Sequence, residues 1–493
     1  MKALRRFIAH RSPVVACGVF WLLLAIGGGA VADEAVPGDL LPVVAPVANV
    51  VEREGITGAG SIGVAGDGSG RRLIALYPNH PDDFGGSVGT GAALSDDGGG
   101  TWRPGSDDWP LPGTVDLWLD RLRDGRLMAF GMRWAPDPAK RGQLTAADVP
   151  ADAYRMAVSE DGGQTWRPET AVIECPPEYG VIARPLFHFF EGEAGDLYMP
   201  AYAWGPRGNH ALLLRSADGG RRWQVHGSLV SAAAIVGAGI PVTTPWLESS
   251  VTPVAGGEWL AVVRTGSSAT AALVAVRSAD GGRTWSAPTA VVAGPGRRPV
   301  AGKLPTVMRL PGGSLVLLTA HTKNHCRLFV SRDGTGRHWD SGHILTSQSG
   351  GNAGMTVTGA DSLVVTSPAN RRIDAWRVTL VENAAVSDRV TAPAAVTVSG
   401  AEATVTWTPP ADEAVVKRYR VTPILLAPAA GQPDTEIWPY APVETADAST
   451  RSLVLGRKLS LGGRYRFEVV AIDAEGRPSP PARSGEVIAG AKP

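Results

Sequence analysis

The chain has 493 residues, more than one domain usually contains, so we expect two or more domains. Its 47 Lys and Arg residues balance its 47 Asp and Glu residues, and no long basic run interrupts the sequence. This balance argues against nucleic acid as a partner.

The N-terminal segment 1–32 predicts a secretory signal peptide. Arg5 and Arg6 precede an apolar run at positions 14–26, and Ala-Val-Ala at positions 30–32 has the pattern of a cleavage site. An uncleaved membrane anchor is the alternative, but the apolar run is shorter than the ~20 residues that span a bilayer. We therefore expect a bacterial protein that is secreted or periplasmic, with no transmembrane span once the signal is removed.

Removal of the signal peptide takes Cys17 with it and leaves Cys175 and Cys326. An oxidising compartment permits a disulfide between these two residues. Their spacing does not establish that they meet, so the pairing is left open.

One short phrase, Ser-x-Asp-x-Gly-x-Thr-Trp, occurs five times, with successive copies 53 to 64 residues apart. The copies begin at Ser95, Ser159, Ser216, Ser278 and Ser331. The third copy has Arg222 in place of Thr, and the fifth is one residue longer. Repetition at this period predicts one supersecondary unit that is used repeatedly.

The repeated phrase, called here the Asp box, has the chemistry of a tight turn. Its Asp carboxylate can accept hydrogen bonds from turn N–H groups, its Gly positions allow positive φ, and its Trp is a large apolar anchor. A strand-like run precedes most copies, so we expect the turn to join the two outer strands of a small sheet. Residues repeated in every unit cannot all surround one active site, so the box residues are expected to be structural.

A second repeat, a strand, a glycine turn and a second strand, is interleaved with the boxes. Its six copies have their turns near Gly68, Gly125, Gly195, Gly256, Gly312 and Ala360. Four strands per unit predict an all-β fold with a six-bladed β-propeller over residues 43–385. We expect the segment 43–47 to close the ring against the segment 373–378. No amphipathic helix of useful length occurs there, which argues against βαβ architectures.

The last hundred residues form a different pattern. Alternating strands, a single Trp407 and the spacing from Leu461 to Tyr465 resemble a fibronectin type III β-sandwich over residues 390–489. The resemblance implies that Tyr465 is the tyrosine corner of this sandwich. The expected role of the domain is spacing or attachment, and nothing in the sequence supports direct glycan binding by it.

The signal peptide, the Asp boxes and the six predicted blades together resemble the sialidase (neuraminidase) superfamily, over roughly residues 43–380. The resemblance implies a central face on which three arginines hold the carboxylate of the substrate. It also implies a Tyr nucleophile paired with a Glu, and an Asp that acts as acid and base. Guanidinium groups suit a carboxylate, and a neutral nucleophile does not repel an anionic sugar.

Several positions match this arrangement. Glu248, at the start of the innermost strand of the fourth predicted blade, corresponds to the Glu of the family, and Arg264, at the end of the second strand, corresponds to its second Arg. In the first blade, the loop after Tyr77 offers Asp83 or Asp82 as the acid/base. Arg327 lies where the third Arg is expected.

Two features of the family are missing. The segment 56–60 lacks the Arg-Ile-Pro sequence that carries the first arginine, and Arg53 is out of place for that role. The segment 349–354 shows Asn352 where the nucleophilic Tyr is expected. Both departures argue against hydrolysis of sialic acid by the mechanism of the family.

Further polar and aromatic groups are expected on the central face. Asp116 opens the innermost strand of the second blade, and Arg133 ends the strand that pairs with it. Tyr179 and Arg184 are expected to precede the innermost strand of the third blade, and His188 to lie within it, facing away from its two phenylalanine neighbours. Such groups on a concave face suit an acidic carbohydrate. No cluster has the spacing of a metal site, so we expect no metal and no other cofactor.

Three hypotheses follow. The first is an exo-glycosidase for an acidic or otherwise polar terminal sugar, with Glu248 and Asp83 as its carboxylates and Arg264, Arg133 and Arg327 as its clamp. A separation of about 5 Å between the carboxylates favours retention of configuration, and about 6.5–9.5 Å favours inversion. The second is a non-catalytic propeller that binds a carbohydrate or glycoconjugate. The third is an interaction scaffold. The sequence leaves the oligomeric state open.

Overall fold

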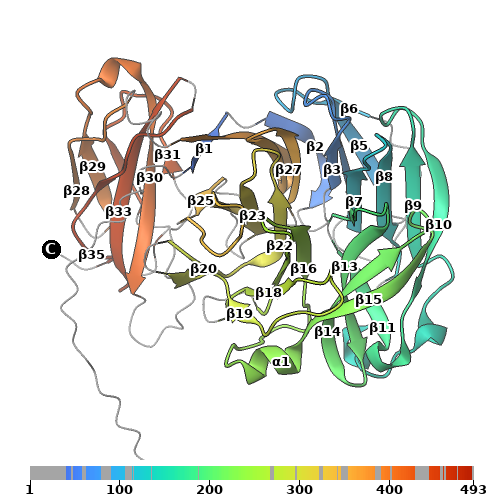
Figure 1. Cartoon of the computed structure of the whole chain (residues 1–493). Coiled ribbons are helices and arrows are strands. Elements are labelled where there is room, and N and C mark those ends of the chain that lie inside the picture. The colour runs from blue at the N-terminus through green and yellow to red at the C-terminus, as the bar shows by residue number, and fades with distance from the viewer. Residues whose placement is uncertain are drawn as a thin grey trace, which may run out of the picture. The chain divides into compact units, whose positions relative to one another are not determined.

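The computed structural model describes residues 40–45, 48–57, 63–78, 90–105, 111, 114, 116–134, 136–186, 188–266, 271–294, 297–320, 326–340, 342–345, 353–382, 390–399, 402–427, 443–455, 459, 462–474 and 476–490. This part of the chain is mostly β (Figure 1). The described helices are short: α1 (Ala232–Gly237) and the 3₁₀ turns η1 (Pro138–Lys140), η2 (Ala146–Asp148), η3 (Pro177–Tyr179) and η4 (Glu413–Val415). None of the helices in the described ranges is both long and apolar enough to cross a bilayer.

Successive strands form antiparallel sheets in chain order. One sheet holds β3 (Gly63–Gly66), β4 (Leu73–Pro78), β5 (Thr90–Ser95) and β6 (Arg103–Pro104). The next strands are β7 (Asp116–Arg121), β8 (Leu127–Met132), β9 (Tyr154–Ser159) and β10 (Arg167–Glu174). They are followed by β11 (Val181–Pro185), β12 (Phe190–Glu191), β13 (Leu197–Gly205), β14 (Gly208–Ser216) and β15 (Arg222–Ser231).

The later sheets repeat this plan. One contains β16 (Ser249–Pro253), β17 (Trp259–Val263), β18 (Val274–Ser278) and β19 (Thr289–Ala290). After a short pair formed by β20 (Val292–Ala293) and β21 (Arg298–Pro299), another contains β22 (Lys303–Arg309), β23 (Leu315–Ala320), β24 (Cys326–Ser331) and β25 (His343–Ile344). The last combines β26 (Gly354–Gly359) and β27 (Ser362–Glu382) with the N-terminal strands β1 (Leu40–Val44) and β2 (Ala48–Thr57).

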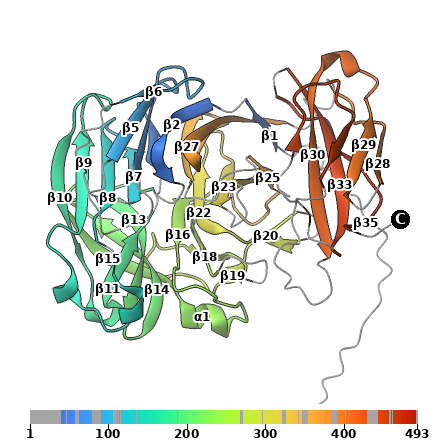
Figure 2. The ribbon, with the colours of Figure 1, turned by 180° about the vertical axis from the view of Figure 1, so that it is seen from behind.

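Strands of neighbouring sheets lie against one another. Strand β3 contacts both β7 and β26, and β16 contacts β13 and β22. Figures 1 and 2 show these sheets side by side from two directions. The N-terminal strands join the last sheet near the expected place: Val44 pairs with Val378, whereas Ala375 pairs with Ala48, which lies just beyond the segment predicted to close the ring. The fold is propeller-like.

Each Asp box forms the predicted turn between the third and fourth strands of a sheet. In the second box, Ser159 Oγ accepts a bond from the Gly163 N–H at 2.7 Å, and Asp161 Oδ1 accepts one from the Thr165 N–H at 2.9 Å. The indole N–H of Trp166 donates to the Gly163 carbonyl at 3.1 Å. The Thr165 hydroxyl is the main cause that holds the pKa of Asp161 far below its usual value. The box residues therefore stabilise turns.

The third box departs from the pattern for a reason that the structure supplies. Strands β10 and β15 pair in parallel, from Val172 opposite Arg222 to Glu174 opposite Gln224, and so join two sheets into one. Arg222, which replaces the Thr of the box, lies 3.1 Å from the Glu174 carboxylate across this junction. The junction could not be predicted from the sequence, because no local motif indicates that two outer strands pair with each other.

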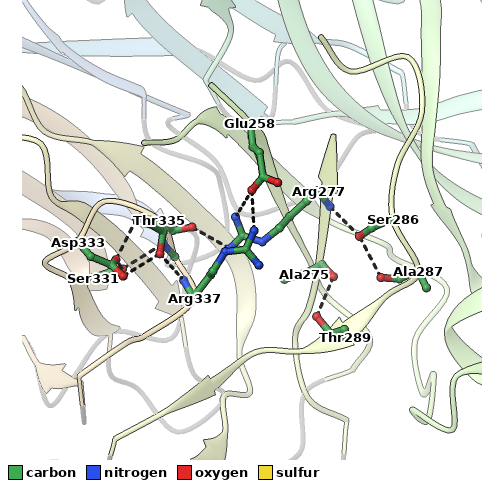
Figure 3. A network of polar contacts seen from close by, with 11 residues as sticks. Glu258, Ala275, Arg277, Ser286, Ala287, Thr289, Ser331, Asp333, Thr335 and Arg337 are labelled. Atoms are coloured by element: carbon green, nitrogen blue, oxygen red, sulfur yellow. Dashed lines mark hydrogen bonds and ion pairs between the residues drawn. The ribbon is translucent and has the colours of Figure 1, made fainter. Parts of the chain in front are cut away.

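The fifth box is linked to the preceding sheet by a network of charged groups (Figure 3). Glu258, in the β16–β17 turn, lies between Arg277 at 3.3 Å and Arg337 at 2.8 Å. Arg277 also donates to the Thr335 carbonyl at 2.7 Å. The network joins the sheets β16–β19 and β22–β25 at the end of the strands where this turn lies.

The C-terminal strands form two further sheets. One contains β28 (Ala395–Ser399), β29 (Thr404–Thr408) and β32 (Ser452–Val454). The other contains β30 (Val416–Ala427), β31 (Val443–Glu444), β33 (Arg464–Asp473), β34 (Ala482–Arg483) and β35 (Val487–Ile488). Trp407, Tyr419 and Tyr465 are buried in one apolar cluster of this part, which gives it a core of its own.

Candidate functional site

Glu248 and Arg264 lie opposite each other at one end of the sheet β16–β19. Glu248 immediately precedes β16, and Arg264 immediately follows β17. Because Ser249 pairs with Val263, Glu248 and Arg264, the next residues along the two strands, are cross-strand neighbours. The Arg264 N–H donates to the Glu248 carbonyl at 2.7 Å, which extends the ladder by one step. Two residues that are distant in sequence therefore share one rung of a hairpin.

Their side chains form a buried ion pair. Arg264 Nη1 lies 2.8 Å from Glu248 Oε2, and Arg264 Nε donates to the Gly266 carbonyl at 3.1 Å. Glu248 is 4% exposed and Arg264 is 5% exposed. Removal of two charges from water is expensive, and such a pair is retained only where both partners are held in good geometry.

The neighbouring sheet supplies a third contact to the carboxylate. The backbone N–H of Leu304, in β22, donates to Glu248 Oε2 at 3.0 Å. Leu304 has a φ of 46°, and the pairing of β22 with β23 shifts register between Lys303 and Thr306. A left-handed conformation is unfavourable for a branched residue such as leucine. Backbone strain of this kind is typical of functional sites.

The described contacts of Glu248 converge on one carboxylate oxygen. Arg264 and Leu304 both bind Oε2, and no described residue donates a hydrogen bond to Oε1. A carboxylate offers about four acceptor positions on its two oxygens. The described contacts therefore leave acceptor positions on Oε1 unused.

Lys303 adds a second cation beside the pair. It is half-buried at the start of β22, opposite Ala320. Burial lowers the pKa of Lys303, the charge of Arg264 lowers it further, and Glu248 opposes both effects. No acidic group of the described residues forms an ion pair with Lys303 within 4.0 Å. Among the described residues, the site thus holds two cations for one carboxylate, which favours an anionic ligand.

Trp246 packs against Arg264 of the candidate site. Its ring lies 5.6 Å from the Arg264 guanidinium carbon, within the range of a cation–π contact. Trp246 is 40% exposed, so part of its ring faces solvent. An exposed indole beside a buried guanidinium has the character of a platform for the apolar face of a sugar ring.

The other arginines predicted for the site occupy different surroundings. Arg133 follows β8 as expected, but it is exposed and its guanidinium is paired with Asp152. Arg327 lies within β24, buried and opposite Thr319, and not in the preceding loop. Arg184 lies within β11, opposite Tyr202, whereas the sequence placed it before the strand, because the strand begins earlier, at Val181.

Tyr179 lies in the turn η3, before β11 as predicted. Its ring packs edge-on against His210, with 5.1 Å between the ring centroids. Asp116 opens β7, as predicted, but its side chain lies outside the described residues. Asp82, Asp83 and Asn352 also lie outside them, so the roles suggested for these residues stay predictions.

His188 corrects a prediction. It was expected within a strand, facing away from its neighbours, but it lies between β11 and β12 with a φ of 49°. Its Nδ1 lies 2.7 Å from Asp120 Oδ1, and the Phe189 N–H donates to the other oxygen of Asp120 at 3.1 Å. Burial opposes protonation of His188, but the Asp120 carboxylate raises the pKa of the imidazole. The sequence does not reveal this pair, because the left-handed residue is a histidine and no glycine marks the turn.

Cys175 and Cys326 are free thiols in this structure. Burial raises the pKa of Cys175 to about 12, and the nearby Glu178 contributes to the rise. In the described part of the chain, no three His, Cys, Asp or Glu side chains are grouped so that they could hold a metal ion.

Comparisons with known proteins identify a domain and a fold. The family model for the BNR repeat-like domain matches residues 119–361. No relative was found among curated proteins. A structure of a protein of unknown function from Dyadobacter fermentans is 17% identical, covers 69% of this chain and 99% of its own, and has a TM-score of 0.52.

Two further solved structures are similar at lower TM-scores. A Hadza microbial sialidase is 19% identical, covers 66% of both chains and has a TM-score of 0.49. A Penicillium chrysogenum α-L-arabinanase, solved with arabinobiose, is 16% identical, covers 69% of this chain and 98% of its own, and has a TM-score of 0.47. At these identities the likeness concerns the fold alone. Residues 119–361 are thus similar to a BNR repeat-like domain, and the described sheets have a propeller-like fold.

Proposed function

We propose that this protein is a secreted, sialidase-like protein that acts on glycans with an anionic terminal sugar. The observation that carries the proposal is the buried Glu248–Arg264 pair, with Lys303 as a second cation beside it. Arg264 and Lys303 together exceed the charge of Glu248, so a carboxylate on the sugar completes the balance.

The proposal includes the architecture. The sheets that begin with β3, β7, β11, β16, β22 and β26 correspond to six blades over residues 43–385. The two C-terminal sheets, with Trp407 and Tyr465 in their core, support a fibronectin type III domain over residues 390–489. Residues 1–32 are proposed as a signal peptide for export from a bacterium.

The chemistry assigned to the site is glycoside hydrolysis. Oε2 of Glu248 is held by Arg264 and Leu304, and the unused acceptor positions on Oε1 are proposed to meet the substrate. Asp83 is proposed as the second carboxylate, which protonates the leaving oxygen. Their separation decides the stereochemistry: about 5 Å supports retention of configuration, and about 6.5–9.5 Å supports inversion.

A second candidate function is carbohydrate binding without catalysis. The observation that favours it is the burial of Glu248, whose carboxylate is only slightly accessible and is bound by two donors. In that case Glu248 positions the guanidinium of Arg264, and Arg264 and Lys303 bind the ligand.

The two candidates are distinguished by activity and binding measured together. Wild type, Glu248→Gln and the control Glu444→Gln are assayed on chromogenic glycosides of neutral and acidic sugars, including a sialoside. Glu444 pairs with Arg418 and Arg420 in the C-terminal sheets, so its variant controls for the loss of an ion-paired carboxylate.

Hydrolysis of an acidic glycoside that Glu248→Gln abolishes and Glu444→Gln preserves supports the enzyme. Binding of acidic sugars without hydrolysis supports the second candidate. Equal affinity for acidic and neutral sugars, or none for either, refutes the proposed site.

A further inference from the structure

The connection that leads into Glu248 is apolar and exposed. No charged residue occurs between Gly227 and Leu247. Within this stretch, residues 232–246, called here the apolar lip, leave β15 and include α1. Val236 is 59% exposed, and several of the alanines around it are exposed as well. Contiguous apolar surface on a soluble protein typically marks a binding region.

The apolar lip is held in place by specific contacts. Ser231 Oγ caps α1 by accepting a bond from the Ala234 N–H at 3.1 Å. Ile235, on the inner side of α1, is fully buried and anchors the helix to β14 and β15. The indole N–H of Trp204 donates to the Pro245 carbonyl at 3.1 Å. Because these contacts order the lip in advance, little entropy is lost when a ligand binds to it.

The far end of the lip borders the candidate site. The Thr243 N–H donates to the carbonyl of Thr265, the residue after Arg264, at 2.8 Å. Trp246 places its ring against the Arg264 guanidinium. A sugar bound at Arg264 therefore lies next to Trp246, and whatever is attached to that sugar can extend along the lip.

We propose that the apolar lip binds the apolar aglycone of the same glycoside whose anionic sugar occupies the Glu248–Arg264 site. This inference rests on the proposed function. The expected aglycone is an alkyl or acyl chain, because the lip has no charged side chain that could bind a polar aglycone. A second copy of this chain and a lipid surface are the other occupants that the experiment tests.

The test measures dissociation constants by calorimetry. The probes are methyl and octyl thioglycosides, which resist hydrolysis, of N-acetylneuraminic acid and of glucuronic acid. We expect wild type to bind the octyl compound about tenfold more tightly than its methyl counterpart, as burial of a few methylene groups allows. Val236→Lys and Val236→Ser are expected to lose this preference while they bind the methyl compound normally. The control is Val454→Lys, since Val454 in β32 is 60% exposed.

The outcomes separate the inference from the proposed function. If neither acidic glycoside binds, the proposed function fails first. If methyl and octyl compounds bind equally, only the lip assignment fails. If Val236→Lys has a lower sedimentation mass than wild type, the lip binds a second copy of the chain. If wild type binds neutral phosphatidylcholine vesicles without any sugar and Val236→Lys does not, the lip binds a bilayer. Either result overturns the inference.

Discussion

Removal of the guanidinium from the buried pair is the sharpest test of the site. In Arg264→Met, the Glu248 carboxylate loses its cation and keeps the Leu304 N–H. Loss of one partner from a buried ion pair costs about 3–5 kcal/mol of unfolding free energy. Because the backbone donor remains, we expect the lower end of this range, about 3 kcal/mol.

The double variant distinguishes the pair from its parts. Glu248→Leu alone leaves a buried guanidinium without its carboxylate and is expected to cost about 3 kcal/mol as well. When both charges are removed together, the unpaired Leu304 N–H is the main penalty left, about 1–2 kcal/mol. The double variant is therefore expected to be more stable than either single variant.

Urea unfolding followed by tryptophan fluorescence measures these free energies, and hydrogen exchange at the Leu304 amide reports on the site itself. In both variants without Glu248, protection of this amide is expected to fall, and in Arg264→Met it is expected to persist. A cost below about 1 kcal/mol for Arg264→Met, or additive costs in the double variant, refutes the description of a coupled buried pair.

Three further predictions concern protonation and ligand charge. The turn hydrogen bonds lower the pKa of Asp97 to about 2 despite an opposing burial effect, and they lower that of Asp161 further. A carboxylate whose folded pKa lies below its unfolded pKa stabilises the native state above about pH 4. This stabilisation is expected to be lost as pH falls toward 2. Asp161→Asn is therefore expected to make the melting temperature depend less on pH in the acid range. Asp120 raises the pKa of His188, so the protonated pair stabilises the folded state. This stabilisation is complete below the unfolded pKa of about 6.5 and is lost as pH rises through the folded pKa. His188→Asn is expected to remove that slope, and an NMR titration showing an unshifted imidazole contradicts the prediction. Lys303→Gln is expected to weaken binding of an acidic sugar about tenfold and to leave a neutral sugar unaffected, and equal losses for both sugars in calorimetry contradict the assigned role.

The features that sequence predicted well depend on short-range pairing. The opposition of Glu248 and Arg264 follows from one hairpin, whose short turn fixes the register of β16 and β17. The box turns follow from glycines and aspartates at set offsets, and their hydrogen bonds recur from one copy to the next. The closing pair of Val44 and Val378 follows from the need to complete a ring.

The features that sequence did not predict depend on contacts between sheets. The Leu304 N–H reaches Glu248 where β22 shifts register between Lys303 and Thr306, and the sequence does not show that this segment faces Glu248 of the preceding sheet. His188 meets Asp120 across two sheets through another left-handed residue. Arg327 lies within a strand that begins at Cys326, opposite Thr319, and the sequence did not show where the preceding loop ends.

The site is a joint between two sheets. Glu248 accepts one bond from Arg264 of its own sheet and one from Leu304 of the next, and Ser250 Oγ accepts from the Val307 N–H at 3.0 Å along the same seam. At the turn end of these strands, Glu258 joins the same two sheets through Arg337. Because contacts join the two sheets at both ends of the seam, neither sheet can tilt without breaking the contacts at one end. The left-handed conformation of Leu304 is therefore sustained by the packing between sheets, and the geometry of the candidate site is a property of the closed ring.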